Sequence, residues 1–277
     1  MTMAYVDVRN LRISLRQPAG MLDVVRGIDL QVDRGEIFAI VGESGSGKTM
    51  ATTALLGLGP SNAVTTADRM EVGGLDLTQG KWSGVRGRKI AMIFQDPAAS
   101  LNPVFRVGAQ MDQVLRLHTS LGRAARRTRC LQLLEETGLP DPERVLRLYP
   151  HQMSGGMQQR VLIALALSAG ADLLIADEPT TALDVTVQAQ ILALLRSLRD
   201  RHGLTILFIS HDLGIIAQFC DRVAVMRQGR VVEQGRVSEV LHHPRHPYTQ
   251  ALLAAIPGRN PRGAALPTLA SSLTDGD

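Results

Sequence analysis

The chain has 277 residues, a net charge of +4 and an apolar content of 45%. It is therefore long enough to bury a sizeable core, and its composition is that of a globular protein. Aromatic residues make up only 3%, which disfavours a basic, aromatic-rich surface for nucleic acid. The two cysteines, Cys130 and Cys220, cannot alone form a disulfide framework or a four-ligand zinc site. With no secretory signal and no apolar run long enough to span a bilayer, we expect a soluble, cytoplasmic protein.

The first part of the chain predicts an antiparallel sheet. Polar and apolar residues alternate over residues 6–8, 11–15 and 28–32. A period of two residues between turn signals is typical of strands that keep one face in water.

Three later runs predict strands of another kind. Residues 37–41, 173–176 and 205–209 are almost continuously apolar, as in strands buried on both faces. Between the last two, apolar positions over 187–201 follow helical spacing,. Strand, helix and buried strand in succession predict a parallel sheet with crossover helices.

The remaining segments predict helices and a tail. Residues 97–159 contain helical patterns at 108–118 and 124–137 and no buried strand. This segment is interpreted as a helical insertion into the parallel-sheet core. Beyond it, we expect a short helix near 248–256 and a flexible tail over 258–277.

The strongest chemical motif is Gly-Glu-Ser-Gly-Ser-Gly-Lys-Thr at residues 42–49. It is a complete G-x-x-x-x-G-K-[ST] sequence, and it follows a predicted buried strand and precedes a helical run. Its glycines allow backbone amides to turn toward phosphate oxygens. Lys48 supplies a charge for the β- and γ-phosphates, and the Thr49 hydroxyl can bind Mg²⁺.

Two further motifs fit the same chemistry. Residues 173–178 form an apolar strand that ends in Asp177 and Glu178, and parallel sheets bind ligands at this edge. Asp177 is suited to hold a metal and Glu178 to orient the attacking water. Ser154-Gly155-Gly156 begins a helical run and predicts a second anion cradle. Since the chain already has one phosphate loop, we expect this second cradle to serve a nucleotide bound by another subunit.

Taken together, these motifs resemble the ATP-binding cassette of ABC transporters over about residues 5–257. Residues 42–49 match its Walker A motif, 153–159 its signature and 173–178 its Walker B. Gln95 matches the Q-loop glutamine, Asp184 the D-loop aspartate and His211 the switch histidine. Within the family, residues 95–103 and the His-Pro-Tyr-Thr sequence at 246–249 resemble the oligopeptide, dipeptide and nickel importer subgroup.

The resemblance implies an α/β fold: a P-loop, RecA-like parallel-sheet core, an N-terminal antiparallel β subdomain and an inserted helical subdomain at about 97–159. It also implies ATP and Mg²⁺ as cofactors and Glu178 and His211 as catalytic residues. Thr49, Gln95 and Asp177 are the implied Mg²⁺ ligands. The implied ATP-binding residues are Gly42, Glu43, Ser44, Gly45, Ser46, Gly47, Lys48, Thr49 and Gln95. The implied contacts to the ATP of a partner subunit are Ser154, Gly155, Gly156, Met157 and Gln158.

Two positions depart from the family pattern. Leu15 stands where many cassettes have an aromatic residue that stacks on adenine, and Met157 stands where the signature usually has Gln. No cysteine follows Cys220, so we expect no iron–sulfur cluster in the tail.

The function predicted is an ATPase subunit that powers import of oligopeptides or dipeptides. The resemblance implies a second ATPase subunit, identical or different, two membrane-spanning permeases and an extracytoplasmic substrate-binding protein. It implies no nucleic acid, and a peripheral position on the cytoplasmic face of the inner membrane. Import of nickel or a metal chelate by the same mechanism stays open. A cassette ATPase acting on DNA or ribosomes is the alternative of another class, although residues 48–154 lack the heptads of a coiled coil.

Overall fold

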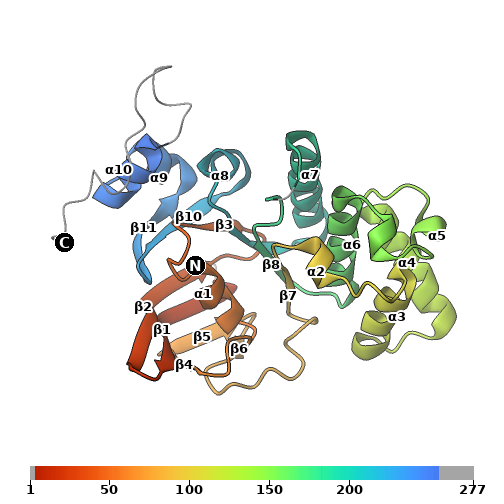
Figure 1. The fold of residues 1–277 in the computed structure, drawn as a ribbon, viewed down its shortest axis with the longest axis horizontal. Helices are drawn as coiled ribbons and strands as arrows, with labels where there is room; N and C mark the ends of the chain where they lie inside the picture. The colour runs from red at the N-terminus through yellow and green to blue at the C-terminus, as the bar shows by residue number, and fades with distance from the viewer. Residues whose placement is uncertain (1–3, 182, 256–277) are drawn as a thin grey trace. The chain divides into compact units, whose positions relative to one another are not determined.

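The computed structural model describes residues 4–181 and 183–255, which belong to two compact units (Figure 1). The first unit is built from residues before 81 and after 207, and the second from residues 81–207. The tail predicted at 258–277 lies outside the described residues.

The first unit contains the predicted antiparallel sheet. Its strand order is β2-β1-β5-β6, and β4 also pairs with β1. The strands are β1 (Val6–Gln17), β2 (Gly20–Val32), β4 (Ala63–Thr66), β5 (Arg69–Val72) and β6 (Leu75–Asp76). The last three strands were not predicted, because strands of two to four residues are too short to show a clear alternation of polar and apolar residues.

The strands predicted separately at 6–8 and 11–15 are one continuous strand, β1. The pairing with β2 shifts register between Val8 and Leu11, and Asn10 between them has a φ of 48°. A bulge of this kind breaks the two-residue alternation without ending the strand. This break explains why the sequence pattern suggested two strands.

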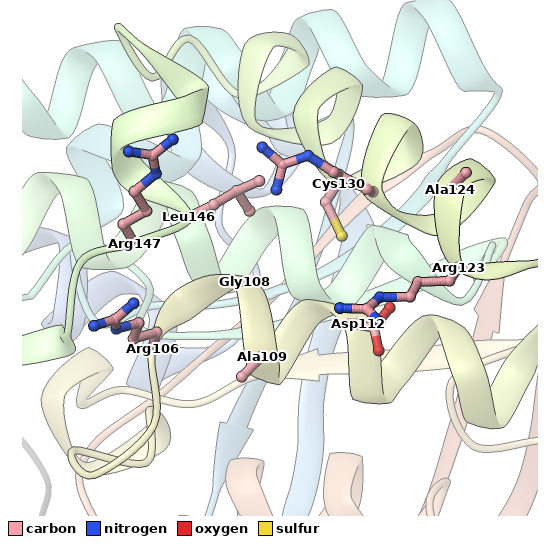
Figure 2. Close-up of a pocket in the computed structure, with 10 residues that line it drawn as sticks. Arg106, Gly108, Ala109, Asp112, Arg123, Ala124, Cys130, Leu146 and Arg147 are labelled. Atoms are coloured by element: carbon pink, nitrogen blue, oxygen red, sulfur yellow. The ribbon is translucent and has the colours of Figure 1, made fainter.

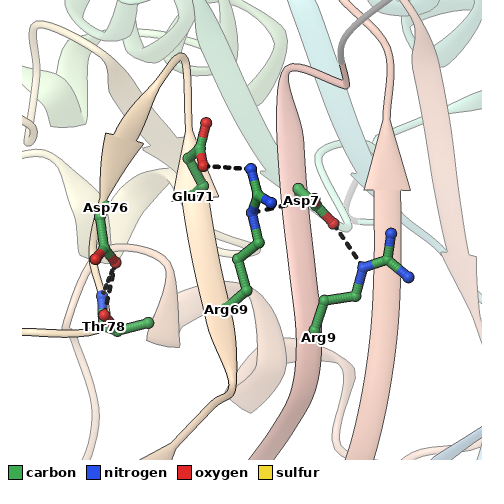
Figure 3. A network of polar contacts seen from close by, with 6 residues as sticks. All are labelled: Asp7, Arg9, Arg69, Glu71, Asp76 and Thr78. Atoms are coloured by element: carbon green, nitrogen blue, oxygen red, sulfur yellow. Dashed lines mark hydrogen bonds and ion pairs between the residues drawn. The ribbon is translucent and has the colours of Figure 1, made fainter.

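Charged pairs cross the outer face of this sheet (Figure 3). Asp7 lies opposite Glu71 and Arg9 opposite Arg69. Asp7 binds both Arg9, at 2.9 Å, and Arg69, at 3.2 Å, and Arg69 also binds Glu71 at 2.7 Å. Of these three pairs, Asp7–Arg69 joins β1 to β5, whereas the other two lie within one strand. Each exposed pair contributes only about 0–1 kcal/mol.

The first unit also holds a parallel pair of strands. β3 (Ile37–Val41) is buried along its whole length and pairs in parallel with β10 (Arg222–Arg227). β11 (Arg230–Arg236) pairs antiparallel with β10. Helices α8, α9 and α10 contribute buried side chains to the core beside these strands. Their bounds are Leu213–Phe219, Val237–His242 and Pro247–Ala254.

The second unit combines parallel strands with the predicted helical segment. β7 (Ile90–Ile93) and β8 (Leu173–Asp177) are parallel neighbours. The predicted helix at 187–201 is α7 (Val185–His202), and the chain then passes through β9 (Thr205–Ile209) into the first unit. The other helices are α2 (Pro97–Ser100), α3 (Val107–His118), α4 (Arg123–Glu136), α5 (Pro142–Val145), a 3₁₀ turn (Pro150–Gln152) and α6 (Gly155–Ser168).

Helix α6 crosses the boundary predicted for the helical segment at residue 159 and continues to Ser168. Its buried side chains, from Val161 to Leu167, form the centre of the helical part. Among the described residues, no helix is both long enough and apolar enough to span a membrane.

Candidate functional site

The glycine-rich segment 42–49 forms a loop between β3 and α1 (Lys48–Ala54), and its lysine folds back onto it. Lys48 Nζ donates to the carbonyl oxygens of Gly42 and Glu43, both at 2.8 Å. Lys48 is only 7% exposed, and the Ser46 amide donates to the Glu43 carbonyl at 3.2 Å. The chain's own hydrogen bonds therefore close the loop around the lysine.

Neighbouring strands pack so tightly on this loop that two positions require glycine. A Cβ on Gly42 would lie 2.1 Å from the carbonyl oxygen of Met226, and a Cβ on Gly47 would lie 2.9 Å from that of Val24. Gly47 also has a φ of +99°, which side chains rarely adopt,. The loop is therefore supported by β2 and β10 as well as by its own bonds.

Tyr248 also supports the loop, and the sequence motifs gave it no role there. The Glu43 amide donates to the Tyr248 hydroxyl oxygen at 3.2 Å, across 205 positions of the chain. Tyr248 is fully buried, and burial raises the pKa of its phenol. It belongs to the His-Pro-Tyr-Thr sequence at the start of α10. No local pattern predicts a contact over this separation.

In the second unit, the register of two strands brings Gln95 and Glu178 together. Ile93 on β7 pairs with Ala176 on β8, so residues two positions further along meet at the carboxyl edge. Gln95 Nε2 donates to Glu178 Oε2 at 3.1 Å, and the Thr181 hydroxyl donates to the same oxygen at 2.9 Å. The carboxylate is thus oriented by two neutral donors.

The backbone at Glu178 adopts a left-handed conformation, with a φ of 47°. Such a conformation costs about 1–3 kcal/mol in a residue other than glycine and persists where the surroundings impose it. The preceding residue, Asp177, ends β8 and is 7% exposed. The two carboxylates therefore differ in environment, one buried at the strand end and one half-buried beyond it.

The predicted second cradle lies at the start of α6. Ser154 is exposed and caps the helix, since its hydroxyl oxygen accepts the Met157 amide at 3.4 Å. A Cβ on Gly156 would lie 2.7 Å from the Val187 side chain. Gln158 turns inward and donates to the Pro150 carbonyl at 2.8 Å, so its side chain holds the preceding turn.

Two other predicted residues lie beside the ends of elements, and Leu15 lies within a strand. Asp184 is exposed and caps α7 by accepting the Val187 amide at 2.9 Å. His211 is exposed directly after β9. Leu15 is half-buried in β1, paired with Leu22 and Ala63.

The predicted residues are divided between the two units, and among them the structure brings Gln95 and Glu178 into direct contact. The loop at 42–49 and His211 belong to the first unit, whereas Gln95, Ser154 and the acids at 177, 178 and 184 belong to the second. Among the described residues, no group of three or more His, Cys, Asp and Glu side chains is arranged to bind a metal by itself. The roles of these residues remain predictions.

Comparison with known proteins identifies the family. The family model described as ABC transporter matches residues 25–181. The chain belongs to the ABC transporter family. A second model, described as the C-terminal region of oligopeptide/dipeptide transporters, matches residues 232–275. The second match contains most of β11, together with Tyr248 and α10.

Individual relatives agree with this membership. The oligopeptide transport ATP-binding protein OppD of Bacillus subtilis (strain 168) is 47% identical over 91% of this chain and 72% of its own length. The dipeptide transport ATP-binding protein DppD of Lactococcus lactis subsp. cremoris (strain MG1363) is 44% identical over 91% and 73%. Glutathione import ATP-binding proteins named GsiA are also similar. The GsiA of Escherichia coli (strain K12) is 46% identical over 90% of this chain and 42% of its own length.

Solved structures confirm the fold class. The ATP-binding cassette MJ0796, described as a dimer in a post-hydrolysis state bound to ADP and Pi, is 28% identical. The alignment covers 84% of this chain and 98% of that one, with a TM-score of 0.69. The predicted α/β cassette is therefore correct, and so is the resemblance to the oligopeptide and dipeptide importer subgroup.

Proposed function

We propose that the chain is the ATP-hydrolysing subunit that powers import of oligopeptides or dipeptides through a membrane-spanning ABC transporter. The observation that carries the proposal is the joint match of one chain to two family models. The ABC transporter model covers residues 25–181, and the oligopeptide/dipeptide C-terminal model covers 232–275. OppD and DppD, named as oligopeptide and dipeptide transport proteins, support the same substrate class.

In this function the loop at 42–49 is the phosphate cradle. Its lysine already lies against the loop backbone, 2.8 Å from two carbonyl oxygens. The strands around the loop fix its course, so little reorganisation is needed when phosphates arrive. Backbone amides of the loop then bind phosphate oxygens, and Lys48 supplies the charge.

Thr49, Gln95 and Asp177 suit Mg²⁺ by their chemistry. A hydroxyl, an amide oxygen and a carboxylate are hard oxygen donors of the type that this ion prefers. Thr49 and Gln95 are exposed, and Asp177 ends a strand at the carboxyl edge. When bound, the ion neutralises charge on the β- and γ-phosphates.

Glu178 and His211 form the hydrolytic part of the proposal. The Glu178 carboxylate is oriented by Gln95 and Thr181. It can accept a proton from an attacking water, which is the positioning that phosphoryl transfer requires. His211, exposed after β9, donates to the developing phosphate.

The start of α6 serves the nucleotide of a second cassette. Ser154 and Gly155 are exposed, so this cradle is available to another molecule. Val185, next to Asp184, is 81% exposed, as expected for an apolar side chain at an interface. Gly156 and Met157 complete the helix start, whereas Gln158 acts indirectly by holding residue 150.

The membrane partner is accommodated by the second unit. An apolar groove of about 530 Å³ is lined by residues of β7, α3 and α6, and three of its large apolar side chains, Phe94, Phe105 and Leu117, are 44–65% exposed. It begins at Phe94, next to Gln95. We assign it to a helix of a permease subunit, so that occupancy of the γ-phosphate position and docking are linked through Gln95. The full assembly would then contain two permeases, a second cassette and a substrate-binding protein, with this chain on the cytoplasmic face of the membrane.

The cargo is tested by reconstitution. The chain, its second cassette and two permeases are placed in proteoliposomes with the cognate binding protein, and ATP turnover is measured with candidate cargoes. We expect oligopeptides or dipeptides to stimulate turnover. Stimulation by nickel or a nickel chelate alone would overturn the peptide assignment and keep the ATPase. Failure of every loaded binding protein to stimulate turnover would overturn the importer.

A further inference from the structure

A cavity of about 790 Å³ in the helical part of the second unit has a rim of arginines (Figure 2). It lies between α3, α4 and the segment after α5. It is not part of the groove assigned to the permease. Its lining consists of Arg106, Gly108, Ala109, Asp112, Arg123, Ala124, Arg127, Cys130, Leu146 and Arg147.

Most of the positive charge on this rim has no carboxylate partner in the part of the chain that the structure describes. Asp112 is engaged by Arg126, which lies outside the lining, at 2.7 and 3.3 Å. Arg127 pairs with Glu143.

Three guanidinium groups are left. Within residues 4–181 and 183–255, the guanidinium groups of Arg123 and Arg147 form no hydrogen bond and no ion pair, and that of Arg106 lies over the Tyr149 ring at 5.5 Å. All three are exposed and border one cavity.

The start of α4 adds to this positive potential. Its first turn contains no acid, and Gly122 provides no side-chain cap. Helix starts are usually stabilised by acids, because unpaired amides make this end positive. Here Arg123, Arg126 and Arg127 follow instead. Asp112 and Glu143 pair with the last two, so the added positive potential comes from Arg123 and the helix start.

The floor of the cavity is apolar. Cys130 is 2% exposed and Leu146 is 7% exposed. Burial raises the pKa of the Cys130 thiol to about 11, so the thiol stays uncharged near neutral pH. A ligand that fits both the arginine rim and the apolar floor has a multiply charged anionic group attached to an apolar part.

We propose that this cavity is a binding site for a phosphate-bearing ligand, held by Arg106, Arg123 and Arg147. The planar guanidinium fork matches phosphate oxygens in pairs, and three forks exceed what a single carboxylate needs. The volume is that of a small-molecule site. The phosphate comes either from a soluble phosphate ester or from the headgroup of an anionic phospholipid.

The test compares two double variants of equal charge. R123A/R147A removes two unpaired arginines of the cavity. R116A/R144A removes two exposed arginines on α3 and α5 that do not line it. Both are made in a Lys48→Ala background, so that the loop at 42–49 does not bind the probe. Inorganic pyrophosphate is titrated by calorimetry, and vesicles of phosphatidylglycerol or of phosphatidylcholine alone are tested by co-sedimentation.

We expect R123A/R147A to weaken binding by about tenfold or more, since charge-assisted contacts are lost, while R116A/R144A binds as the parent does. Selective loss of pyrophosphate binding identifies a soluble source, and selective loss of phosphatidylglycerol binding identifies a lipid. The proposal is overturned if the parent binds neither probe, or if both double variants weaken binding equally.

A second inference concerns Tyr248 and rests on the proposed nucleotide site. The Glu43 amide donates to the Tyr248 hydroxyl oxygen, and the Glu43 carbonyl oxygen accepts a hydrogen bond from Lys48 Nζ. Tyr248 is itself fixed, because Arg227 lies over its ring at 5.2 Å and its amide donates to His246 Nδ1 at 3.1 Å. The Glu233 carboxylate accepts the amides of residues 245 and 246.

We infer that Tyr248 is a positioning residue for ATP binding, by which the C-terminal segment sets the first peptide of the phosphate loop. Tyr248→Phe keeps the buried ring and removes only the hydroxyl. We expect the KM and Kd for ATP to rise about three- to tenfold, the range of one lost hydrogen bond, with kcat nearly unchanged. Tyr5→Phe, a buried tyrosine at the start of the antiparallel sheet, is the matched control.

A merely structural role would lower the melting temperature and leave Kd unchanged in the folded protein, and that result would overturn the inference. Lys48→Ala distinguishes a failure of this inference from a failure of the proposed nucleotide site. If it removes ATP binding while Tyr248→Phe has no effect on Kd, only this inference fails. If neither variant changes ATP binding, the proposed nucleotide site fails.

Discussion

The two units differ in how complete their functional groups are within one chain. In the first, the loop at 42–49 is closed by internal bonds, and Lys48 is 7% exposed. In the second, Gln95 and Ser154 are exposed and Glu178 is half-buried, and the Ser154 hydroxyl caps its own helix. We infer that the two units have different roles. The loop of the first unit is preformed for binding, and the second unit holds groups that act on a ligand bound elsewhere.

The largest effect is expected from Lys48→Ala in the first unit. The change removes the only positive charge of the loop, and charge-assisted contacts contribute about 1.5–3 kcal/mol each. We expect ATP affinity to fall at least a hundredfold, roughly two such contacts, with loss of turnover. Affinity is measured by fluorescence of an ATP analogue, with Lys81→Ala as the exposed control. Retained affinity would mean that the loop is not the cradle.

Glu178→Gln should distinguish the role of the second unit from that of the first, because we expect it to change turnover and not binding. The amide keeps the shape of the side chain but cannot accept a proton from water. We expect hydrolysis to fall by about 10²–10⁴-fold, with ATP affinity within about twofold, a difference below 0.5 kcal/mol. Phosphate release is measured beside Glu135→Gln, an exposed position on α4. Turnover at the parent rate would show that another group activates water.

A smaller effect is expected from Gln95→Ala. This change removes a donor that orients Glu178, and Thr181 remains at 2.9 Å. Loss of one neutral hydrogen bond, about 0.5–1.5 kcal/mol, predicts a turnover reduced about two- to tenfold, and more if Gln95 also binds Mg²⁺. Gln132→Ala, exposed on α4, provides the comparison. A Mg²⁺ titration of both variants shows which role dominates.

The smallest effect is expected from Ser154→Ala on stability. The hydroxyl caps α6 through the Met157 amide at 3.4 Å, and loss of a cap costs about 0.5–2 kcal/mol. Denaturant unfolding of the isolated chain measures this loss. If turnover of the paired cassettes falls further than the stability change accounts for, the serine also acts on the partner's nucleotide. An unchanged free energy of unfolding would remove its capping role.

The sequence predicted the elements that carry the motifs, because their signals are local. The buried strand before residue 42, the helix start at 155 and the acids after 176 each follow from a short pattern. The sequence did not predict that Gln95 meets Glu178, because that contact depends on the register of β7 against β8. It did not predict the Tyr248 contact or the approach of Met226 to Gly42 either. Such contacts depend on how distant strands pack, and no local periodicity reports them.

The central claim is that the cradle at Ser154 is completed only by the nucleotide of a second cassette. It is tested most directly by weighing the Glu178→Gln chain with and without ATP, alone and with the cassette ATPase encoded by a neighbouring gene. We expect ATP to shift the mass to that of a cassette pair in at least one of these samples, and Ser154→Arg to prevent the shift. A single-chain mass with ATP in every sample, or a pair that forms equally well with Ser154→Arg, would contradict it.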